Sequence, residues 1–99
     1  MDKERQWEFV LNHSDEQIRR MARSAVDEPA LRPLFPYPSM RSLRFSRVST
    51  EYPYDPMPYI RTEDPGESYE LRDVDNRPLM KGSLDDVIRE LARVVSSTS

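Results

Sequence analysis

The chain has 99 residues, of which 36% are hydrophobic and 33% are charged, and its formal net charge is -3. This length allows one hydrophobic core, and so small a net charge lacks the self-repulsion typical of disordered chains. The chain has no cysteine, which excludes disulfides and thiolate metal sites, and no stretch approaches the roughly 20 apolar residues of a membrane span. With no signal-like run at its start, we expect a cytoplasmic protein.

Residues 1–28 are predicted to form a helical N-terminal region. Ser14 fits an N-cap, with Gln17 three residues further on as in a capping box. Apolar residues then recur at helical spacing, at Ile18, Met21, Ala22 and Ala25. Residues 3–11 fit either a short amphipathic helix or a strand of period two, and their Lys, Glu, Arg and Gln content favours the helix.

The next part of the chain changes from prolines to a strand pattern. The run PALRPLFPYP, residues 29–38, cannot hold a long helix, because each proline removes a donor and restricts the residue before it. The first strand is predicted at residues 42–48, where Leu43 and Phe45 face one side and Arg44 faces the other.

Three further elements complete the predicted fold. Residues 58–63 fit a short strand, residues 68–81 a hairpin around an Asp-Asn turn, and residues 83–95 a helix that begins at Ser83. We therefore expect one α+β domain. Its antiparallel sheet of three or four strands spans residues 42–81, with the N-terminal helix or helices and the C-terminal helix packed on one face.

The centre of the chain carries a series of short motifs. Residues 28–60 contain a P-x-L-R-x-L-F-P run, Ser39, the motif LRFSR, the motif YPYD and a final PYI. In these motifs the chain resembles a family of small, functionally uncharacterised proteins, mainly actinobacterial, known as natural product biosynthesis proteins. Met40 departs from that pattern, since members often have histidine after the serine. The resemblance implies a fold and a biological setting, but no mechanism.

No catalytic constellation is evident in the sequence. His13 is the only histidine, and its place before a capping serine is typical of a solvated loop residue. Two glycines are too few for a glycine-rich phosphate loop, and Asp85 and Asp86 suit the first turn of a helix. We therefore expect no catalytic residues, no metal and no cofactor.

Binding residues are predicted where a basic stretch meets a tyrosine and proline segment. Residues 29–48 carry four arginines and no acid, and guanidinium groups bind carboxylates or phosphates bidentately. Alternatively, these arginines pair with acids of the second half. The prolines of YPYDPMPYI limit its conformations, so its tyrosines can line a pocket, or the segment can cover a sheet edge. The candidate binding residues are Arg44, Arg47, Tyr52, Tyr54, Asp55 and Tyr59.

These features favour a non-catalytic binding or accessory protein of bacterial specialised metabolism, which binds a small metabolite or a partner protein. One alternative is a small acid/base enzyme of the isomerase or cyclase type, with Asp55 and Tyr54 or Tyr59 in proton transfer. Another is a regulatory or antitoxin-like module that docks through the sheet face carrying Arg44, Glu70 and Arg72. A homodimer stays open. Nucleic acid and membrane partners are not expected, because the basic residues form no concentrated face.

Overall fold

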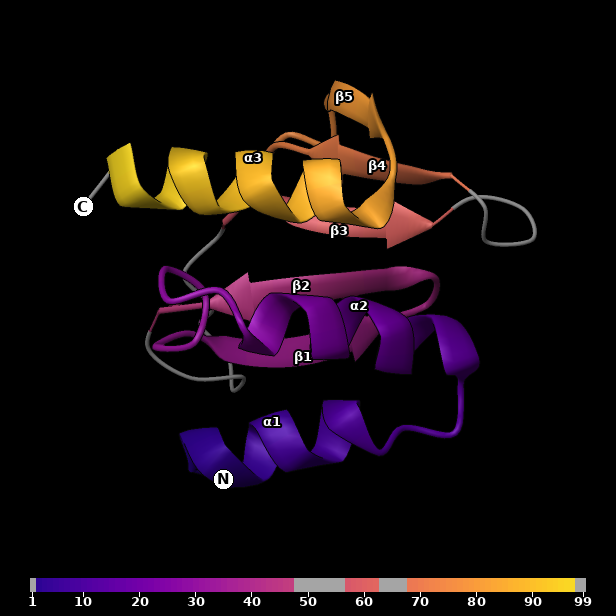
Figure 1. Cartoon of the computed structure of the whole chain (residues 1–99), viewed down its shortest axis with the longest axis vertical. Coiled ribbons are helices and arrows are strands. Elements are labelled where there is room, and N and C mark those ends of the chain that lie inside the picture. Colours follow the sequence, from indigo (N-terminus) through magenta and orange to yellow (C-terminus); the bar gives the residue numbers. More distant parts are fainter. Residues whose placement is uncertain (1, 48–56, 63–67, 98–99) are drawn as a thin grey trace.

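The structure is a computed structural model that describes residues 2–47, 57–62 and 68–97. Five antiparallel strands form one sheet in the order β1-β2-β3-β4-β5, and three helices accompany it (Figure 1). In chain order the elements are α1 (Lys3–Leu11), α2 (Glu16–Val26), β1 (Phe35–Ser39), β2 (Ser42–Ser46), β3 (Tyr59–Thr62), β4 (Tyr69–Arg72), β5 (Pro78–Gly82) and α3 (Leu84–Ser97). The predicted α+β class is confirmed. The prediction of three or four strands was wrong, because the sheet begins at Phe35 rather than at Ser42.

The additional strand is β1, which contains two prolines and pairs with β2 through a two-residue turn. In such a hairpin the hydrogen-bonded pairs recur at every second position from the turn. Pro36 and Pro38 therefore occupy the positions whose nitrogens face away from β2, on the edge of the sheet. Proline is tolerated there because no ladder hydrogen bond is lost. The proline-rich sequence thus excludes a helix but still permits an edge strand.

Each helix begins at a capping side chain. The Asp2 carboxylate accepts a hydrogen bond from the Arg5 N–H at 2.9 Å, and the predicted helix over residues 3–11 is confirmed. Helix α2 is capped by Asp15 instead of the expected Ser14, since the Asp15 carboxylate accepts from the Gln17 N–H at 2.8 Å. The Ser83 hydroxyl accepts from the backbone N–H three residues on, as expected for the start of α3.

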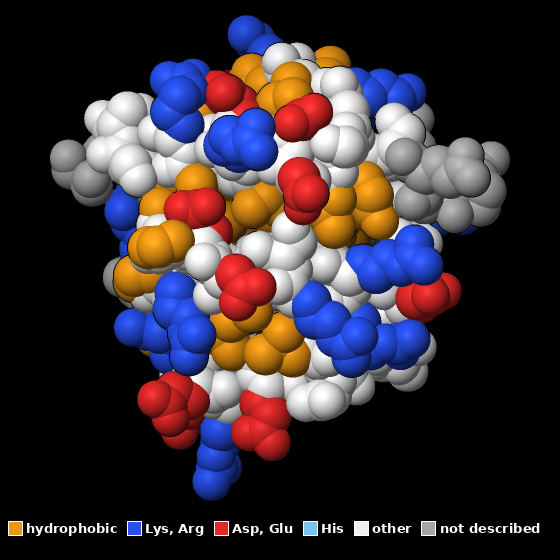
Figure 2. All heavy atoms as spheres, in the orientation of Figure 1, with side chains coloured by type: hydrophobic (Ala, Val, Ile, Leu, Met, Phe, Trp, Pro, Cys, Tyr) orange, Lys and Arg blue, Asp and Glu red, His pale blue; other side chains and the backbone are white. Residues whose placement is uncertain are grey.

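Helices α2 and α3 pack on the same face of the sheet, with α3 over β3, β4 and β5 and α2 over β2 (Figure 1). Helix α1 packs against α2 and β1. The predicted placement of the helices on one face is therefore confirmed for α2 and α3. Acidic and basic side chains are interspersed on the surface in Figure 2, with hydrophobic side chains visible between them. No helix in the described part of the chain is long and apolar enough to cross a membrane.

The core lies between the sheet and these helices. The Trp7 ring of α1 lies 6.2 Å from that of Phe45 on β2, measured between centroids. The indole N–H of Trp7 donates to the backbone carbonyls of Arg32 at 3.1 Å and Leu34 at 3.0 Å. This side chain therefore joins α1 to the segment that leads into β1. The largest fully buried side chains include Ile18, Met21, Leu31, Leu43, Ile60, Leu71 and Leu91.

Candidate functional site

The face of the sheet turned away from α2 and α3 carries polar and aromatic side chains in two cross-strand rows. Strand register determines these rows, because residues that pair across neighbouring strands lie on the same face. In the first row Tyr37 pairs with Arg44, Arg44 lies over Tyr59, and Tyr59 pairs with Arg72. The second row runs from Ser39 through Ser42, Arg61 and Glu70 to Lys81.

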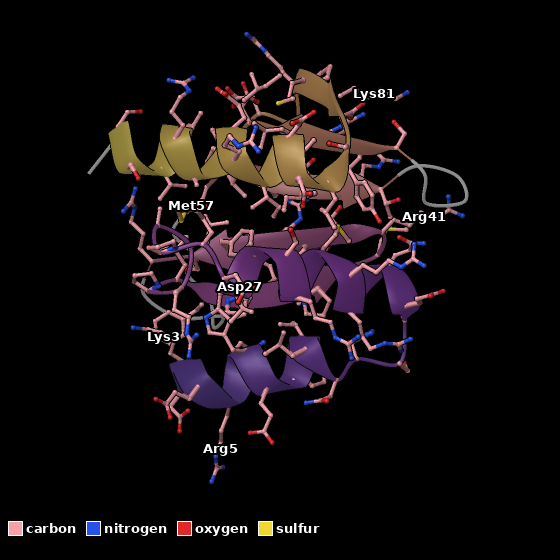
Figure 3. All side chains as sticks on the ribbon, viewed as in Figure 1. Lys3, Arg5, Asp27, Arg41, Met57 and Lys81 are labelled. Atoms are coloured by element: carbon pink, nitrogen blue, oxygen red, sulfur yellow. The ribbon has the colours of Figure 1, made fainter. Side chains whose placement is uncertain are left out.

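A cleft of about 310 Å³ opens on this face, where β1, β2 and β3 approach the β4–β5 turn. Three arginines line it: Arg41 from the β1–β2 turn, Arg44 from β2 and Arg61 from β3. Arg41 projects at the end of the β1–β2 hairpin (Figure 3). Ser39 and Ser42, whose side chains carry hydroxyl groups, also line the cleft. The cleft therefore combines three positive charges with small hydrogen-bonding groups.

Arg44 is held against the ring of Tyr59. Its guanidinium carbon lies 3.8 Å from the ring centroid, well within the distance of a cation–π contact, which is about 6 Å. Its Nε is buried and has no hydrogen-bond partner. Within the described ranges, no ion pair involves the side chains of Arg41, Arg44 or Arg61. Stacking on Tyr59 thus fixes the plane of the Arg44 guanidinium group.

Tyr59 is fixed in turn by a hydrogen-bond network behind it. Its hydroxyl donates to the side-chain oxygen of Asn76, a residue of positive φ (67°) in the β4–β5 turn. The Arg72 guanidinium donates to the same oxygen at 3.3 Å and also bonds the Glu70 carboxylate. Because a guanidinium can only donate, the amide oxygen of Asn76 must face Arg72. The amide nitrogen of Asn76, which lines the cleft, then remains available as a donor.

Two of the six predicted binding residues meet at this site. Arg44 and Tyr59 are in direct contact, whereas Arg47 is exposed beyond the end of β2 and does not line the cleft. The predictions for Tyr52, Tyr54 and Asp55 fall outside the described residues.

The face was expected to carry Arg44, Glu70 and Arg72, and it does. It is less open than expected, because only 2% of Tyr59 and 7% of Glu70 is exposed.

Sequence reasoning missed two of the three cleft arginines. Arg41 belongs to the basic stretch of residues 29–48, but it was not among the candidate binding residues. It lies in the β1–β2 turn, where its carbonyl accepts a hydrogen bond from the Thr62 N–H at 3.0 Å. Arg61 is the cross-strand partner of Ser42, a relation that depends on the β2–β3 register. Alternation within residues 58–63 was the one signal that could have placed Arg61 beside Tyr59, on the same face.

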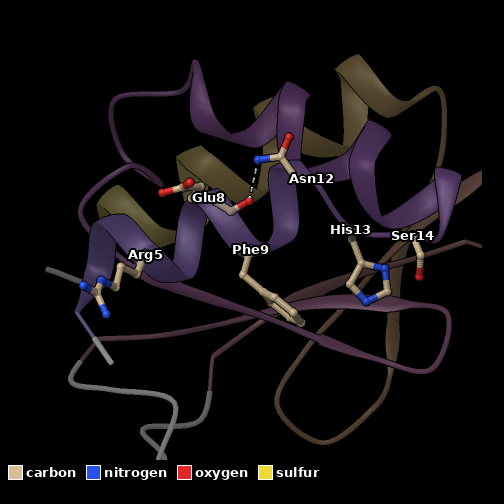
Figure 4. Close-up of a pocket in the computed structure, with 6 residues that line it drawn as sticks. All are labelled: Arg5, Glu8, Phe9, Asn12, His13 and Ser14. Atoms are coloured by element: carbon tan, nitrogen blue, oxygen red, sulfur yellow. Dashed lines mark hydrogen bonds between the residues drawn. The ribbon is translucent and has the colours of Figure 1, made fainter.

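A second, larger hollow lies along α1 and the α1–α2 connection, and Figure 4 shows six residues that line it. Its polar groups serve the local fold. The His13 Nδ1 accepts the Asp15 N–H at 3.0 Å, and the Asn12 amide donates to the Glu8 carbonyl at 2.9 Å. The ring of His13 lies edge-on to Phe9, with centroids 5.5 Å apart. Since these polar groups bond to the backbone around them, this hollow is the weaker candidate for a site.

The fold and the cleft together define a small α+β protein with an arginine-lined cleft on the sheet face turned away from α2 and α3. Residues 3–95 match the Family of unknown function (DUF6193), and the chain belongs to this family. No curated protein and no solved structure matches the chain. Family membership therefore carries no activity, and function has to be argued from the cleft.

Proposed function

We propose that the protein is a non-catalytic binding protein that takes a small anionic ligand in the cleft of Arg41, Arg44 and Arg61. The observation that supports this proposal is the state of Arg44, whose Nε is buried without a partner while its guanidinium stacks on Tyr59. A buried donor that lacks an acceptor costs about 1 to 3 kcal/mol. A carboxylate or phosphate in the cleft would engage the guanidinium group of Arg44, which lines the cleft, and would offset its charge.

The alternative that the arginines serve only to pair with acidic residues fits this cleft poorly. Glu70 is the acid closest by register, since it pairs with Arg61 across β3 and β4. Its carboxylate is bound by Arg72 instead. Within the described ranges, the lining of the cleft contains no carboxylate at all. The positive charge there is therefore left for an external anion to offset.

The same geometry favours binding over acid/base catalysis. Tyr59 is one of the residues considered for proton transfer, but its hydroxyl group donates a hydrogen bond to the amide oxygen of Asn76. Arginine cannot serve as a base, because it is not deprotonated in proteins. Within residues 2–47, 57–62 and 68–97, no histidine or carboxylate lines the cleft, and no group of three His, Asp or Glu gathers that could hold a metal.

The ligand that we propose is a cytoplasmic metabolite. The resemblance of residues 28–60 to proteins of natural product biosynthesis supports an intermediate of bacterial specialised metabolism as its source. A protein partner of the same pathway could present the same anionic group, but the enclosure of the cleft by side chains from four parts of the sheet favours a small molecule.

The experiment is an NMR titration of the labelled protein with a panel of small carboxylates and phosphates. We expect shifts in the side-chain N–H signals of Arg44, Arg61 and Asn76, and a Kd about 10- to 100-fold weaker in Arg44→Met, since a hydrogen bond to a charged group contributes about 1.5 to 3 kcal/mol. The matched control is Arg89→Met, which removes an exposed arginine of α3. The proposal fails if no anion moves the cleft signals, or if the two variants bind equally.

A further inference from the structure

We propose that the cleft selects a phosphoryl dianion, as in a phosphate monoester, over a monocarboxylate. This inference rests on the proposed function and specifies its ligand class. Three guanidinium groups line the cleft, and its described lining residues include no acid. One carboxylate offsets one of these charges, whereas a phosphate monoester carries about -1.5 to -2 at pH 7. Charge alone therefore favours the phosphoryl group.

The different elements that supply the three arginines support the same ligand. Arg41 comes from the β1–β2 turn, Arg44 from β2 and Arg61 from β3. A carboxylate is planar, and one bidentate arginine engages both of its oxygens. The other two guanidinium groups would then have no acceptor. A phosphoryl group has three acceptor oxygens that point in three directions, so each arginine can reach one of them.

The remaining groups suit an ester of modest size. Ser39, Ser42 and Asn76 also line the cleft, and their side chains carry hydrogen-bond donors. A volume of about 310 Å³ is at the lower end of the range for ligand pockets, which begins near 300 Å³. Met40 is the apolar side chain of the lining and is 94% exposed, so it can contact the organic part of an ester at the surface. The cleft thus fits a phosphoryl group that carries a small substituent.

The pH dependence of binding distinguishes a dianion from a monoanion. The second ionisation of a phosphate monoester has a pKa of about 6, whereas guanidinium groups stay charged in proteins. Binding of the dianion therefore strengthens as the pH rises through 6. Protonation of Glu70 on β4 would act in the opposite direction, because it would make the face more positive at low pH. Among the described residues, the other ionisable side chains in these cross-strand rows are Tyr37 from β1, Tyr59 from β3, Arg72 from β4 and Lys81 from β5.

The experiment compares three ligands that share a phenyl group, measured by calorimetry on the whole chain. Phenyl phosphate is the dianion, phenyl sulfate has the same tetrahedral shape with one charge, and benzoate is planar with one charge. At pH 7.5 we expect phenyl phosphate to bind at least about tenfold more tightly than either monoanion, since each added charge-assisted contact contributes more than about 1.4 kcal/mol. At pH 5, where about nine tenths of the phosphate carries one charge, its advantage over phenyl sulfate should fall by about five- to tenfold.

Each outcome tells the two proposals apart. Equal binding of phenyl phosphate and phenyl sulfate at pH 7.5, or tighter binding of benzoate, overturns the dianion inference and leaves an anion-binding cleft. Binding of none of the three overturns both. Arg61→Met should weaken phenyl phosphate more than benzoate, and an equal loss for both ligands would also contradict the inference. The Kd of inorganic phosphate is measured in the same way. A Kd equal to that of phenyl phosphate assigns the free ion as the ligand, and weaker binding of inorganic phosphate assigns an ester.

Discussion

The contact between Arg44 and Tyr59 makes a quantitative prediction about folding stability. Cation–π pairs contribute about 0.5 to 1 kcal/mol when exposed and about 2 kcal/mol when desolvated. Only 2% of Tyr59 is exposed, the Nε of Arg44 is buried, and the guanidinium carbon lies 3.8 Å from the ring centroid. We therefore expect the Arg44–Tyr59 pair to have a coupling energy of about 1 to 2 kcal/mol, in the upper part of the range for cation–π pairs.

A double-mutant cycle measures this coupling. The free energy of unfolding in urea is determined for the parent protein, Arg44→Met, Tyr59→Leu and the double variant. Loss of the hydroxyl bond from Tyr59 to Asn76 occurs in both Tyr59→Leu backgrounds, so it cancels from the coupling term. The matched control is the cycle with Tyr59→Phe, which keeps the ring and should give a coupling close to zero. A Tyr59→Leu coupling below about 0.5 kcal/mol, the usual error of additivity, would refute the stacked arrangement.

Three further predictions concern the scaffold. Trp7→Phe should lower the free energy of unfolding by about 2 to 4 kcal/mol in urea, because two backbone carbonyls lose their N–H donor and the smaller ring leaves a void; a loss below about 1 kcal/mol would contradict this. Met40→Gly should raise the free energy of unfolding by about 0.5 to 1 kcal/mol, because Met40 has a φ of 55°, which favours glycine, and its side chain is 94% exposed. Met40→Ala should not raise it, because alanine keeps a Cβ atom. Arg93→Gln should raise the pKa of Glu90, which the Arg93 hydrogen bond lowers. The stabilisation that the lowered pKa of Glu90 contributes is lost as the pH falls through that pKa. The pKa of Glu90 is measured by NMR titration of both proteins, and an equal pKa in the variant would contradict the role of Arg93.

The parts of the fold that sequence predicts are those with local signals. Helix α3 has an apolar stripe and a capping serine, and the hairpin of β4 and β5 has an Asp-Asn turn between two strand patterns. These signals act over a few residues, so they survive without knowledge of the rest of the fold. The capping position of α2 differed by one residue because Ser14 and Asp15 are both good caps, and their sequence order alone does not choose between them.

The candidate site was harder to predict because its residues meet through strand register. Ser42 pairs with Arg61, a residue 19 positions further along the chain. A shift of one residue would have moved every side chain of β3 to the other face, and the burial of Ile60 in the core opposes that shift. Arg44 and Tyr59 were both selected from the sequence, but their contact follows from this register. The prolines of β1 concealed the strand whose turn supplies Arg41.

The arrangement on the sheet face turned away from α2 and α3 supports the proposal of ligand binding. Three like charges that share one cleft repel one another, and the buried Nε of Arg44 adds the cost of an unsatisfied donor. The stack on Tyr59 offsets part of that cost. It also commits Tyr59, Asn76, Arg72 and Glu70 to holding one guanidinium in place. An apolar side chain at position 44 would stabilise the fold as well as Arg44 does. If an anion binds in the cleft as we propose, it offsets the repulsion among the three arginines and stabilises the folded state according to its concentration and its Kd.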